Sequence, residues 1–250
     1  MARVPNSDAE IARARMLELV PSGFEEIEGS GWVELAAYTD RAGEEIVRAV
    51  FAEASALPVD AGWEERWRDF HHTVRVGGLW IGPPWERARS GKSAVVVDPG
   101  LAFGTGAHAT TRACIELLAG LERGSLLDAG CGSGVIAVAA ARLGFDPIVA
   151  ADVDPVAVEV ARATARQNGV ALDVRESDVL RDDLPPADVV VANIELAVVE
   201  ALLIRRLART VITSGYVAGE RPRAEGWTIV RDLELDGWSA HVLIATDATC

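Results

Sequence analysis

A glycine-rich turn lies between a predicted strand and a predicted helix, and its residue types suit the binding of a ligand. The apolar run 125–129 predicts the strand, and helical spacing of apolar residues begins at Val135. The turn between them contains Gly130, Gly132 and Gly134. Glycine adopts left-handed backbone angles without steric cost and lets a ligand approach the main chain closely. The turn alone does not identify the ligand, since phosphate-binding loops share this pattern.

Two aspartates near this turn separate the possible ligands. Asp152 ends the next predicted strand, roughly 20 residues after the glycines, where a carboxylate can accept hydrogen bonds from ribose hydroxyls. A phosphate-binding P-loop would need Gly-Lys-Ser/Thr in the turn, but Val135 follows Ser133-Gly134. A dinucleotide turn favours G-x-G-x-x-G, whereas here G-x-G-x-G follows Asp128, whose carboxylate suits a ligand ammonium group better than a pyrophosphate. The pattern favours S-adenosylmethionine over a dinucleotide, and Asp128 can also brace the turn through main-chain N–H groups.

Polar residues follow two further predicted strands. Asp178 comes after the third strand, where its carboxylate could accept from an adenine amino group or lie in a solvated loop. Asn193 ends the fourth strand, where it could cap the next helix or anchor a ligand, and its place after an apolar strand favours the anchor. Ligands of open α/β sheets bind outside the carboxyl ends of the strands, so these side chains are expected to face one crevice.

Short apolar runs alternate with helical segments in the second part of the chain. The predicted strands cover 94–97, 125–129, 147–151, 172–174, 188–192 and 210–213, and the predicted helices cover 111–121, 135–143, 156–168 and 196–208. This alternation predicts an α/β fold with a doubly wound, Rossmann-like and mostly parallel sheet. The runs 227–232 and 239–245, joined around Asp236-Gly237, predict a closing hairpin that adds an antiparallel strand.

The first 56 residues predict a small α/β unit of marginal size for independent folding. Helices are expected at 11–20 and 42–54, and strands at 24–28 and 32–38. Residues 1–10 are polar and are expected to contribute no opening strand. The segment 57–90, rich in tryptophan and broken by Gly and Pro, is expected to be a linker with some order of its own, and 91–250 to be the larger domain.

Composition excludes several classes of protein. The chain has 24 Lys and Arg against 38 Asp and Glu, a net charge of −14, so direct binding of nucleic acid is not expected. Its three cysteines lack metal or redox spacing, which predicts no metal site and a reducing compartment. No segment has the apolar length of a signal peptide or a membrane span. We expect a cytoplasmic protein, monomeric and without a membrane partner.

One longer segment is more specific than the glycine turn. It reads Asp98-Pro99-Gly100-Leu101-Ala102-Phe103-Gly104-Thr105-Gly106-Ala107-His108-Ala109-Thr110-Thr111. With this segment and with 128–134, 152–155, 168–170, 188–194 and 214–215, the chain resembles the bacterial ribosomal protein L11 methyltransferases, the PrmA family. The resemblance implies a seven-stranded methyltransferase domain that binds S-adenosylmethionine, behind a small substrate-recognition domain that is ferredoxin-like and here possibly truncated. It also implies a ribosomal protein partner, L11, methylated on lysine and N-terminal amines.

The resemblance also implies roles for particular residues. The family's cofactor-contacting positions fall on Thr111, Gly130, Asp152 and Asn193. A glycine-hinged loop, 103–108, is expected to close over the cofactor, and the cofactor contacts expected in it are Phe103, Thr105 and Gly106. The full set of expected cofactor contacts is Phe103, Thr105, Gly106, Thr111, Asp128, Gly130, Gly132, Gly134, Asp152, Asp178 and Asn193.

The catalytic residues are expected to follow the fourth strand. The Asn193 amide and the Ile194 carbonyl are expected to orient the acceptor amine, with Glu195 as its proton acceptor, although the family usually has an uncharged residue there. His108 could touch the substrate, but a lone loop histidine is more often structural. Two alternatives stay open: a methyltransferase of another protein or a small molecule, and a non-catalytic S-adenosylmethionine-binding assembly factor.

Overall fold

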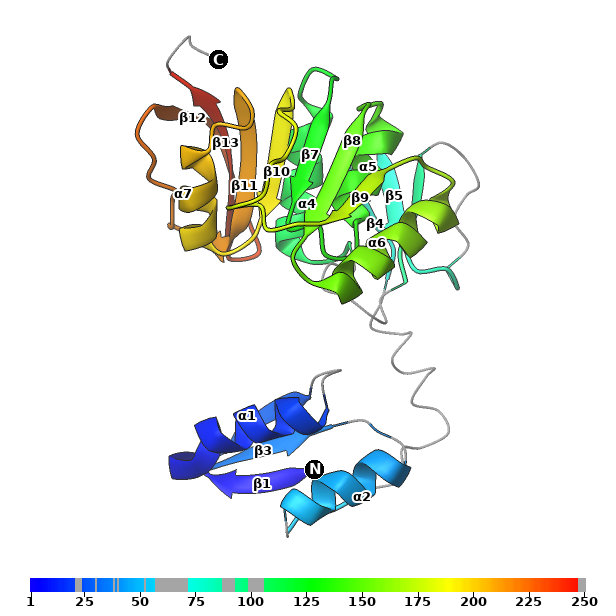
Figure 1. The fold of residues 1–250 in the computed structure, drawn as a ribbon, viewed down its shortest axis with the longest axis vertical. Helices are drawn as coiled ribbons and strands as arrows, with labels where there is room; N and C mark the ends of the chain where they lie inside the picture. Colours follow the sequence, from blue (N-terminus) through cyan, green and yellow to red (C-terminus); the bar gives the residue numbers. More distant parts are fainter. Residues whose placement is uncertain are drawn as a thin grey trace. The chain divides into compact units, whose positions relative to one another are not determined.

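The computed structural model describes residues 1–20, 24–29, 31–37, 39, 41–51, 53–56, 72–86, 93–98 and 106–246 of the 250 residues. The chain divides into two compact units, Met1–Arg66 and Trp67–Cys250 (Figure 1). The second unit therefore begins inside the segment that the sequence predicts to be a linker. No helix in the described part of the chain is long and apolar enough to cross a membrane.

The first unit is a small antiparallel sheet with two helices. Its elements are β1 (Ala2–Pro5), the 3-10 helix η1 (Asn6–Asp8), α1 (Ala9–Leu19), β2 (Glu25–Gly29), β3 (Trp32–Ala36) and α2 (Arg41–Val50). The strands lie in the order β1-β3-β2. The expectation that residues 1–10 lack a strand is wrong. Ala2 is buried, while Arg3 is exposed and pairs with Glu34 of β3 at 2.8 Å. Because only one face of this short strand is buried, its sequence is largely polar.

This element order is the ferredoxin-like pattern β-α-β-β-α-β without its final strand in the described residues. In its place, one residue pair lies beside β1. The amino group of Met1 donates to the Ser55 carbonyl at 2.8 Å, and the Ser55 N–H donates to the Met1 carbonyl at 2.9 Å. The described part of this unit is therefore a shortened version of the domain that the family resemblance implies.

The second unit is built on a seven-stranded sheet, as expected. Its strands are β7 (Leu126–Ala129), β8 (Ile148–Asp152), β9 (Asp173–Glu176), β10 (Val189–Asn193), β11 (Thr210–Val217), β12 (Trp227–Leu235) and β13 (Trp238–Ala245). Their order is β12-β13-β11-β10-β7-β8-β9. The five strands from β11 to β9 are parallel, and the closing hairpin pairs β13 antiparallel to β11. The doubly wound fold and the antiparallel hairpin are both confirmed.

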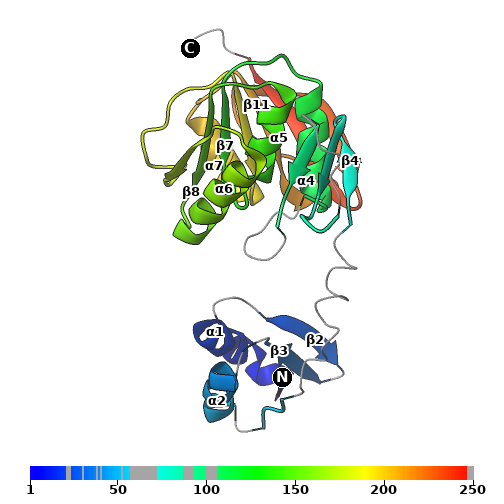
Figure 2. The same ribbon diagram turned by 90° about the vertical axis from the view of Figure 1, so that its right-hand side faces the viewer.

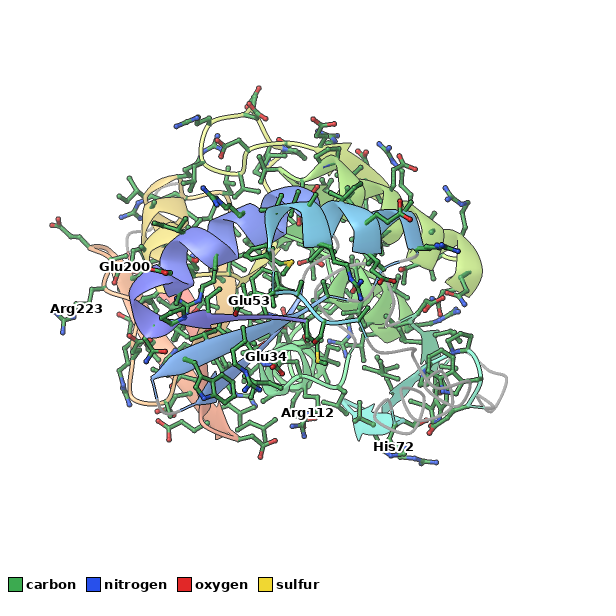
Figure 3. The ribbon with its side chains drawn as sticks, turned by 90° about the horizontal axis from the view of Figure 1, so that it is seen from below. Glu34, Glu53, His72, Arg112, Glu200 and Arg223 are labelled. Carbon is green, nitrogen blue, oxygen red and sulfur yellow. The ribbon has the colours of Figure 1, made fainter. Side chains whose placement is uncertain are left out.

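Helices cover both faces of this sheet (Figure 2). One face packs against α4 (Ala109–Ala119), α5 (Val135–Leu143) and α6 (Pro155–Asn168), and the other packs against α7 (Leu196–Ile204). Alternate residues of β7 serve the two layers, with Leu126 in the first and Leu127 in the second. Between β11 and β12 the chain forms turns rather than a helix. The carboxylate of Glu200 on α7 accepts from the main-chain N–H of Arg223 in this segment at 2.8 Å, and Figure 3 labels both residues.

A second, three-stranded sheet corrects one expectation, the place of the run 94–97. It contains β4 (Val74–Val76), β5 (Leu79–Gly82) and β6 (Ala94–Val96) in that order. Residues 72–86 are thus not only a linker, because Leu79 and Ile81 belong to the core of the second unit. The apolar run 94–97 forms a strand outside the main sheet. The Asn168 amide holds that strand, donating to the Val96 carbonyl at 2.7 Å and accepting from its N–H at 2.8 Å.

Candidate active site

The glycine turn after β7 is tied to the end of β8. The main-chain N–H groups of Gly130 and Cys131 both donate to the Ala151 carbonyl, at 2.8 and 3.0 Å. Gly130 has a φ of 75°, and a Cβ atom there would lie 2.5 Å from Cγ2 of Ile194. Glycine is therefore required at this position both for the turn and for the close approach of the segment after β10.

Asp152 ends β8 with its carboxylate held by two main-chain groups. Oδ2 accepts from the N–H of Gly132 at 2.8 Å, and Oδ1 accepts from the N–H of Asp154 at 3.0 Å. Asp154 in turn caps α6 by accepting from the N–H of Val156 at 2.8 Å, with Pro155 in the first turn. A carboxylate has about four lone-pair sites. Asp152 can therefore accept two more hydrogen bonds, which fits a pair of neighbouring hydroxyl groups.

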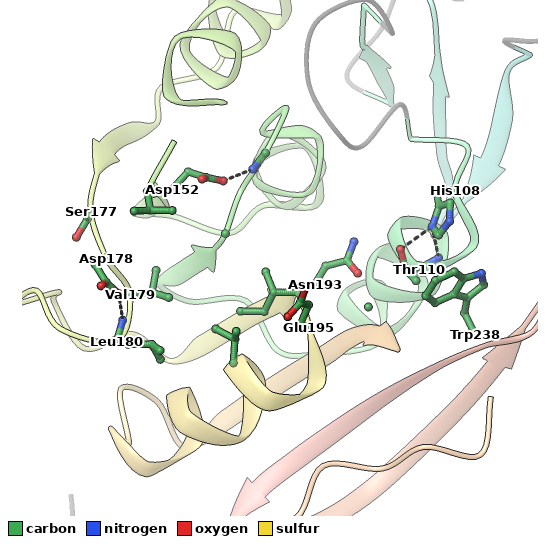
Figure 4. Close-up of a pocket in the computed structure, with 16 residues that line it drawn as sticks. His108, Thr110, Asp152, Ser177, Asp178, Val179, Leu180, Asn193, Glu195 and Trp238 are labelled. Carbon is green, nitrogen blue, oxygen red and sulfur yellow. Dashed lines mark hydrogen bonds between the residues drawn. The ribbon is translucent and has the colours of Figure 1, made fainter. Parts of the chain in front are cut away.

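A cavity of about 530 Å³ opens at the carboxyl ends of the parallel strands (Figure 4). Its described lining residues are His108, Thr110, Gly130, Gly132, Asp152, Val153, Ser177, Asp178, Val179, Leu180, Asn193, Ile194, Glu195, Val198, Gly215 and Trp238. They include three carboxylates and, among the residues that the structure describes, no lysine or arginine. Such a lining favours a ligand that carries positive charge.

Three buried polar atoms near this cavity have no hydrogen-bond partner. They are Oγ1 of Thr111, Oδ1 of Asp128 and Oδ1 of Asn193. Buried polar groups are almost always paired, and leaving one unpaired costs about 1–3 kcal/mol. All three residues are ones that the sequence assigns to cofactor binding. An S-adenosylmethionine molecule, which has hydroxyl, amino and carboxylate groups, fits a site with two unused oxygen acceptors and a hydroxyl.

Asp128 braces the turn and also bears an unusual carboxyl group. Oδ2 accepts from the N–H of Ala137 at 3.0 Å, so the bracing that the sequence allows is present. Burial raises the pKa of Asp128 to about 7, against the opposing effect of the Ala137 N–H and with a further contribution from the charge of Asp152. Between about pH 4 and pH 7, the folded chain therefore holds a proton on Asp128 that the unfolded chain has lost.

This difference predicts how stability depends on pH. Because the pKa of Asp128 is higher in the folded chain, the free energy of unfolding should fall as pH rises from about 4 to about 7 and stay low above it. Asp128→Asn keeps an acceptor for the Ala137 N–H and removes the titration. Above about pH 7 this variant should be more stable than wild type, by up to on the order of 4 kcal/mol. Denaturant unfolding across this range checks it, and parallel curves for the two proteins would contradict it.

The segment after β10 lies over the glycine turn. The N–H of Ile194 donates to the Ser214 carbonyl at 3.1 Å. A β-bulge at Gly215, which has a φ of 103°, lets the backbone pass close by, because a Cβ atom there would lie 2.4 Å from the Ile194 carbonyl oxygen. Glu195, not Asn193, is the N-cap of α7, so Asn193 lines the cavity rather than capping the helix. The Glu195 side chain is exposed and makes no cap hydrogen bond.

Similarity to known proteins identifies the family. A model described as ribosomal protein L11 methyltransferase (PrmA) matches residues 32–219, which is more than half of the chain. The chain belongs to the PrmA family. The matched range contains the glycine turn and the cavity-lining Asp152, Asp178 and Asn193.

Individual relatives agree with this assignment. A ribosomal protein L11 methyltransferase of Azotobacter vinelandii is 43% identical over 195 residues, which are 72% of this chain and 66% of the relative. One of Haemophilus influenzae is 48% identical over 141 residues, 54% of this chain and 48% of the relative. A crystal structure of a ribosomal protein L11 methylase from Lactobacillus delbrueckii subsp. bulgaricus has 26% identity and a TM-score of 0.61, covering 70% of this chain and 100% of that one. The chain thus spans about half to two thirds of the length of these two curated relatives.

The residues expected from the PrmA resemblance separate into several groups in the structure. One group lines the cavity: Gly130, Gly132, Asp152, Asp178, Asn193, Ile194 and Glu195. A second group is not among the lining residues: Gly106, Thr111, Asp128 and Gly134. Gly134 serves packing instead, since a Cβ atom there would lie 2.9 Å from Cβ of Ala161 on α6. A Cβ atom at Gly106 would similarly lie 2.5 Å from Cγ2 of Ile81. Phe103 and Thr105, with most of the expected loop, lie outside the described residues.

His108 has the structural role that a lone loop histidine usually has. It is the N-cap of α4, where its Nδ1 accepts from the N–H of Thr110 at 3.4 Å and lies 2.8 Å from the Thr110 hydroxyl. Its ring also meets the ring of Trp238 edge to face, with centroids 5.0 Å apart. Burial and the charge of Arg112 lower the pKa of His108. Contact of this side chain with a substrate stays a prediction.

Several lining residues were not found from the sequence. Val179 and Leu180 directly follow Asp178 and give that part of the cavity an apolar wall, which a flat adenine ring would suit. Their position after an acidic residue at a strand end was an available signal. Trp238 comes from the closing hairpin, far along the chain, and only the antiparallel pairing of β13 with β11 brings it to the cavity. No local pattern indicates that contact.

Proposed function

We propose that this chain transfers methyl groups from S-adenosylmethionine to lysine or N-terminal amines of ribosomal protein L11. The observation that carries the proposal is the single cavity in which Asp152, the glycine turn and Asn193 meet. Membership of the PrmA family and the absence of cationic side chains from the described lining support it. The proposal includes a cytoplasmic, monomeric enzyme without direct contacts to nucleic acid.

The cofactor would be held by groups near the ends of β7, β8 and β9 and by Thr111 of α4. Asp152 would accept from the two ribose hydroxyls, and Asp178 with the apolar wall beside it would hold the adenine. Asp178 Oδ1 accepts from the N–H of Leu180 at 2.9 Å, and its Oδ2 lies 3.5 Å from Nε of Arg181. A carboxylate has about four lone-pair sites, so Asp178 would bind the adenine amino group through a lone pair that these two contacts leave. Thr111 and Asp128 would satisfy their unpaired oxygens toward the methionine part. When bound, the cofactor supplies an electrophilic methyl group that passes to an amine nitrogen as the sulfonium becomes a thioether.

The acceptor amine must lose a proton before it can react. A lysine amine has a reference pKa of about 10.4, so it reaches the cavity as an ammonium group. Removal from water lowers that pKa, and oxygen acceptors can orient the remaining N–H bonds so that the lone pair points at the methyl group. Asn193 Oδ1 is buried and unpartnered, and the Ile194 carbonyl lies next to it in the chain. Glu195, exposed at the cavity edge, would take the proton and pass it to water.

Labelled methyl transfer into purified L11, free and within ribosomes, tests this function. Cofactor binding is measured by calorimetry in the same sample. Label in L11 is the expected result. Cofactor binding without label in L11 would reject the proposed substrate. Label then found in another component of a lysate would indicate a different methyltransferase, and none would favour the non-catalytic assembly factor. No cofactor binding would reject the site itself.

A further inference from the structure

The geometry points to Trp238 and His108 as the subsite that receives the amine-bearing side chain of the substrate. The ion pair between Arg112 and Asp236 positions the two rings of this subsite. This inference rests on the proposed function and adds the residues that contact the acceptor. Trp238 is the first residue of β13, it lines the cavity, and its partly buried ring packs against His108. Neither the cofactor site nor the core explains an indole at this place.

The two aromatic rings and the cofactor-binding acids lie at different ends of the cavity. Figure 4 shows Asp152 and Asp178 on one side of Asn193, and His108 and Trp238 on the other. A methyl donor held by the aspartates would therefore present its reactive end near Asn193. The acceptor must then approach from the aromatic side, since the donor fills the opposite one.

The chemistry of this corner suits an alkyl ammonium group. A cation over an indole face is stabilised by about 0.5–2 kcal/mol, and the methylene stem of a lysine packs on the same ring. His108 does not oppose this, because its Nδ1 accepts from the N–H of Thr110, which places the proton of the neutral ring on Nε2. Burial and the charge of Arg112 lower the pKa of His108, which favours the neutral ring. Glu195 on the cavity wall adds a negative charge that attracts the incoming cation.

Arg112 links the two chain segments that carry these rings. Its Nε donates to the Ala107 carbonyl at 3.0 Å, directly before His108, and its Nη2 donates to the carboxylate of Asp236. Asp236 and Gly237 form the hairpin turn, with φ values of 49° and 82°, immediately before Trp238. The side chain of Asp236 is 64% exposed, and an exposed pair of this kind adds little stability. The expected role of the ion pair between Arg112 and Asp236 is to fix the position of the Trp238 indole relative to the His108 ring.

Substitution of Trp238 tests the subsite. In Trp238→Ala, kcat/KM for L11 should fall at least about tenfold, while the affinity for S-adenosylmethionine stays within about twofold. Trp238→Phe keeps an aromatic face and should lose less. Trp227→Phe is the matched control on the same hairpin, since Trp227 donates to the Leu203 carbonyl and does not line the cavity. Trp238→Ala that keeps the wild-type kcat/KM would overturn the proposal.

A spectroscopic measurement makes the test independent of turnover. The chain is labelled with fluorotryptophan, and its Trp238 resonance is identified by its loss in Trp238→Phe. With S-adenosylhomocysteine present, addition of n-butylamine should shift that resonance more than the Trp227 resonance. If L11 is not methylated but the resonance shifts, the proposed substrate fails and the amine subsite stands. If the Trp238 resonance does not move, the subsite is rejected whatever the substrate.

The positioning ion pair has its own control. Asp236→Asn should change the Trp238 resonance of the free protein and lower kcat/KM several-fold. Asp232→Asn removes a second exposed ion pair on β12, with Arg221 at 3.3 Å, and should change neither. Because exposed pairs are screened by salt, high salt should move the wild-type resonance toward that of Asp236→Asn. Equal behaviour of the two variants would reject the positioning role of Arg112 and Asp236.

Discussion

Asp152→Ala is expected to weaken S-adenosylmethionine binding by about two to four orders of magnitude. The variant lacks the two hydrogen bonds that the carboxylate would accept from ribose hydroxyls, and each bond to a charged group contributes about 1.5–3 kcal/mol. The variant also loses the bond that the N–H of Gly132 donates to Asp152 Oδ2 at 2.8 Å, while the bonds from Gly130 and Cys131 to the Ala151 carbonyl still join the glycine turn to β8. Calorimetric titration with the cofactor measures the change in affinity.

Two variants control for the loss of local structure. Asp152→Asn keeps one oxygen acceptor and should fall between wild type and alanine. Asp154→Asn alters the neighbouring helix cap but leaves the ribose acceptor, so it should bind the cofactor within a few-fold of wild type. If Asp152→Ala retained wild-type affinity while remaining folded by circular dichroism, the crevice would not be the cofactor site.

Asn193→Ala is expected to lower kcat by about 10²–10³-fold, the usual loss when one preorganised polar group at a reacting centre is removed. Asn193 ends β10 and its Oδ1 is buried without a partner, so the alanine variant leaves only the Ile194 carbonyl to orient the acceptor amine. Cofactor affinity should change by less than about tenfold, because Asp152 and the glycine turn remain. Single-turnover kinetics with L11 separates the chemical step from binding.

Asn193→Asp is the informative partner variant. It keeps an oxygen acceptor of the same size and adds a negative charge next to the amine. It should therefore retain more activity than alanine, with a pH profile that differs from wild type. Equal turnover of Asn193→Ala and wild type, with unchanged cofactor affinity, would show that the amine is oriented elsewhere.

Local features of the site were predictable because they depend on short stretches of sequence. A strand, a glycine turn and a helix follow one another within residues 125–143, and Asp152 ends the next strand. Parallel strands bring their carboxyl ends to one edge, so the meeting of Asp152 with Asn193 follows from the order of elements. The role of Gly134 did not follow, because a Cβ clash with Ala161 of another helix is a long-range property.

Other features depend on contacts that no single segment contains. The strand β1 has a polar sequence, yet it pairs with β3, where its exposed Arg3 forms an ion pair with Glu34. The run 94–97 has the apolar pattern of a main-sheet strand, yet it pairs with β5 and is held by Asn168. Trp238 reaches the cavity only through the pairing of β13 with β11. The roles of Phe103 and Thr105 stay predictions.

The most direct measurement is to map methyl groups on L11 by tandem mass spectrometry after incubation with S-adenosylmethionine and either the wild-type chain or Asn193→Ala. The account predicts methyl groups on lysine side chains or on the N-terminal amine with wild type, and few or none with the variant. Unmodified L11 with a wild-type chain that binds the cofactor would contradict it, as would methylation at a group other than an amine.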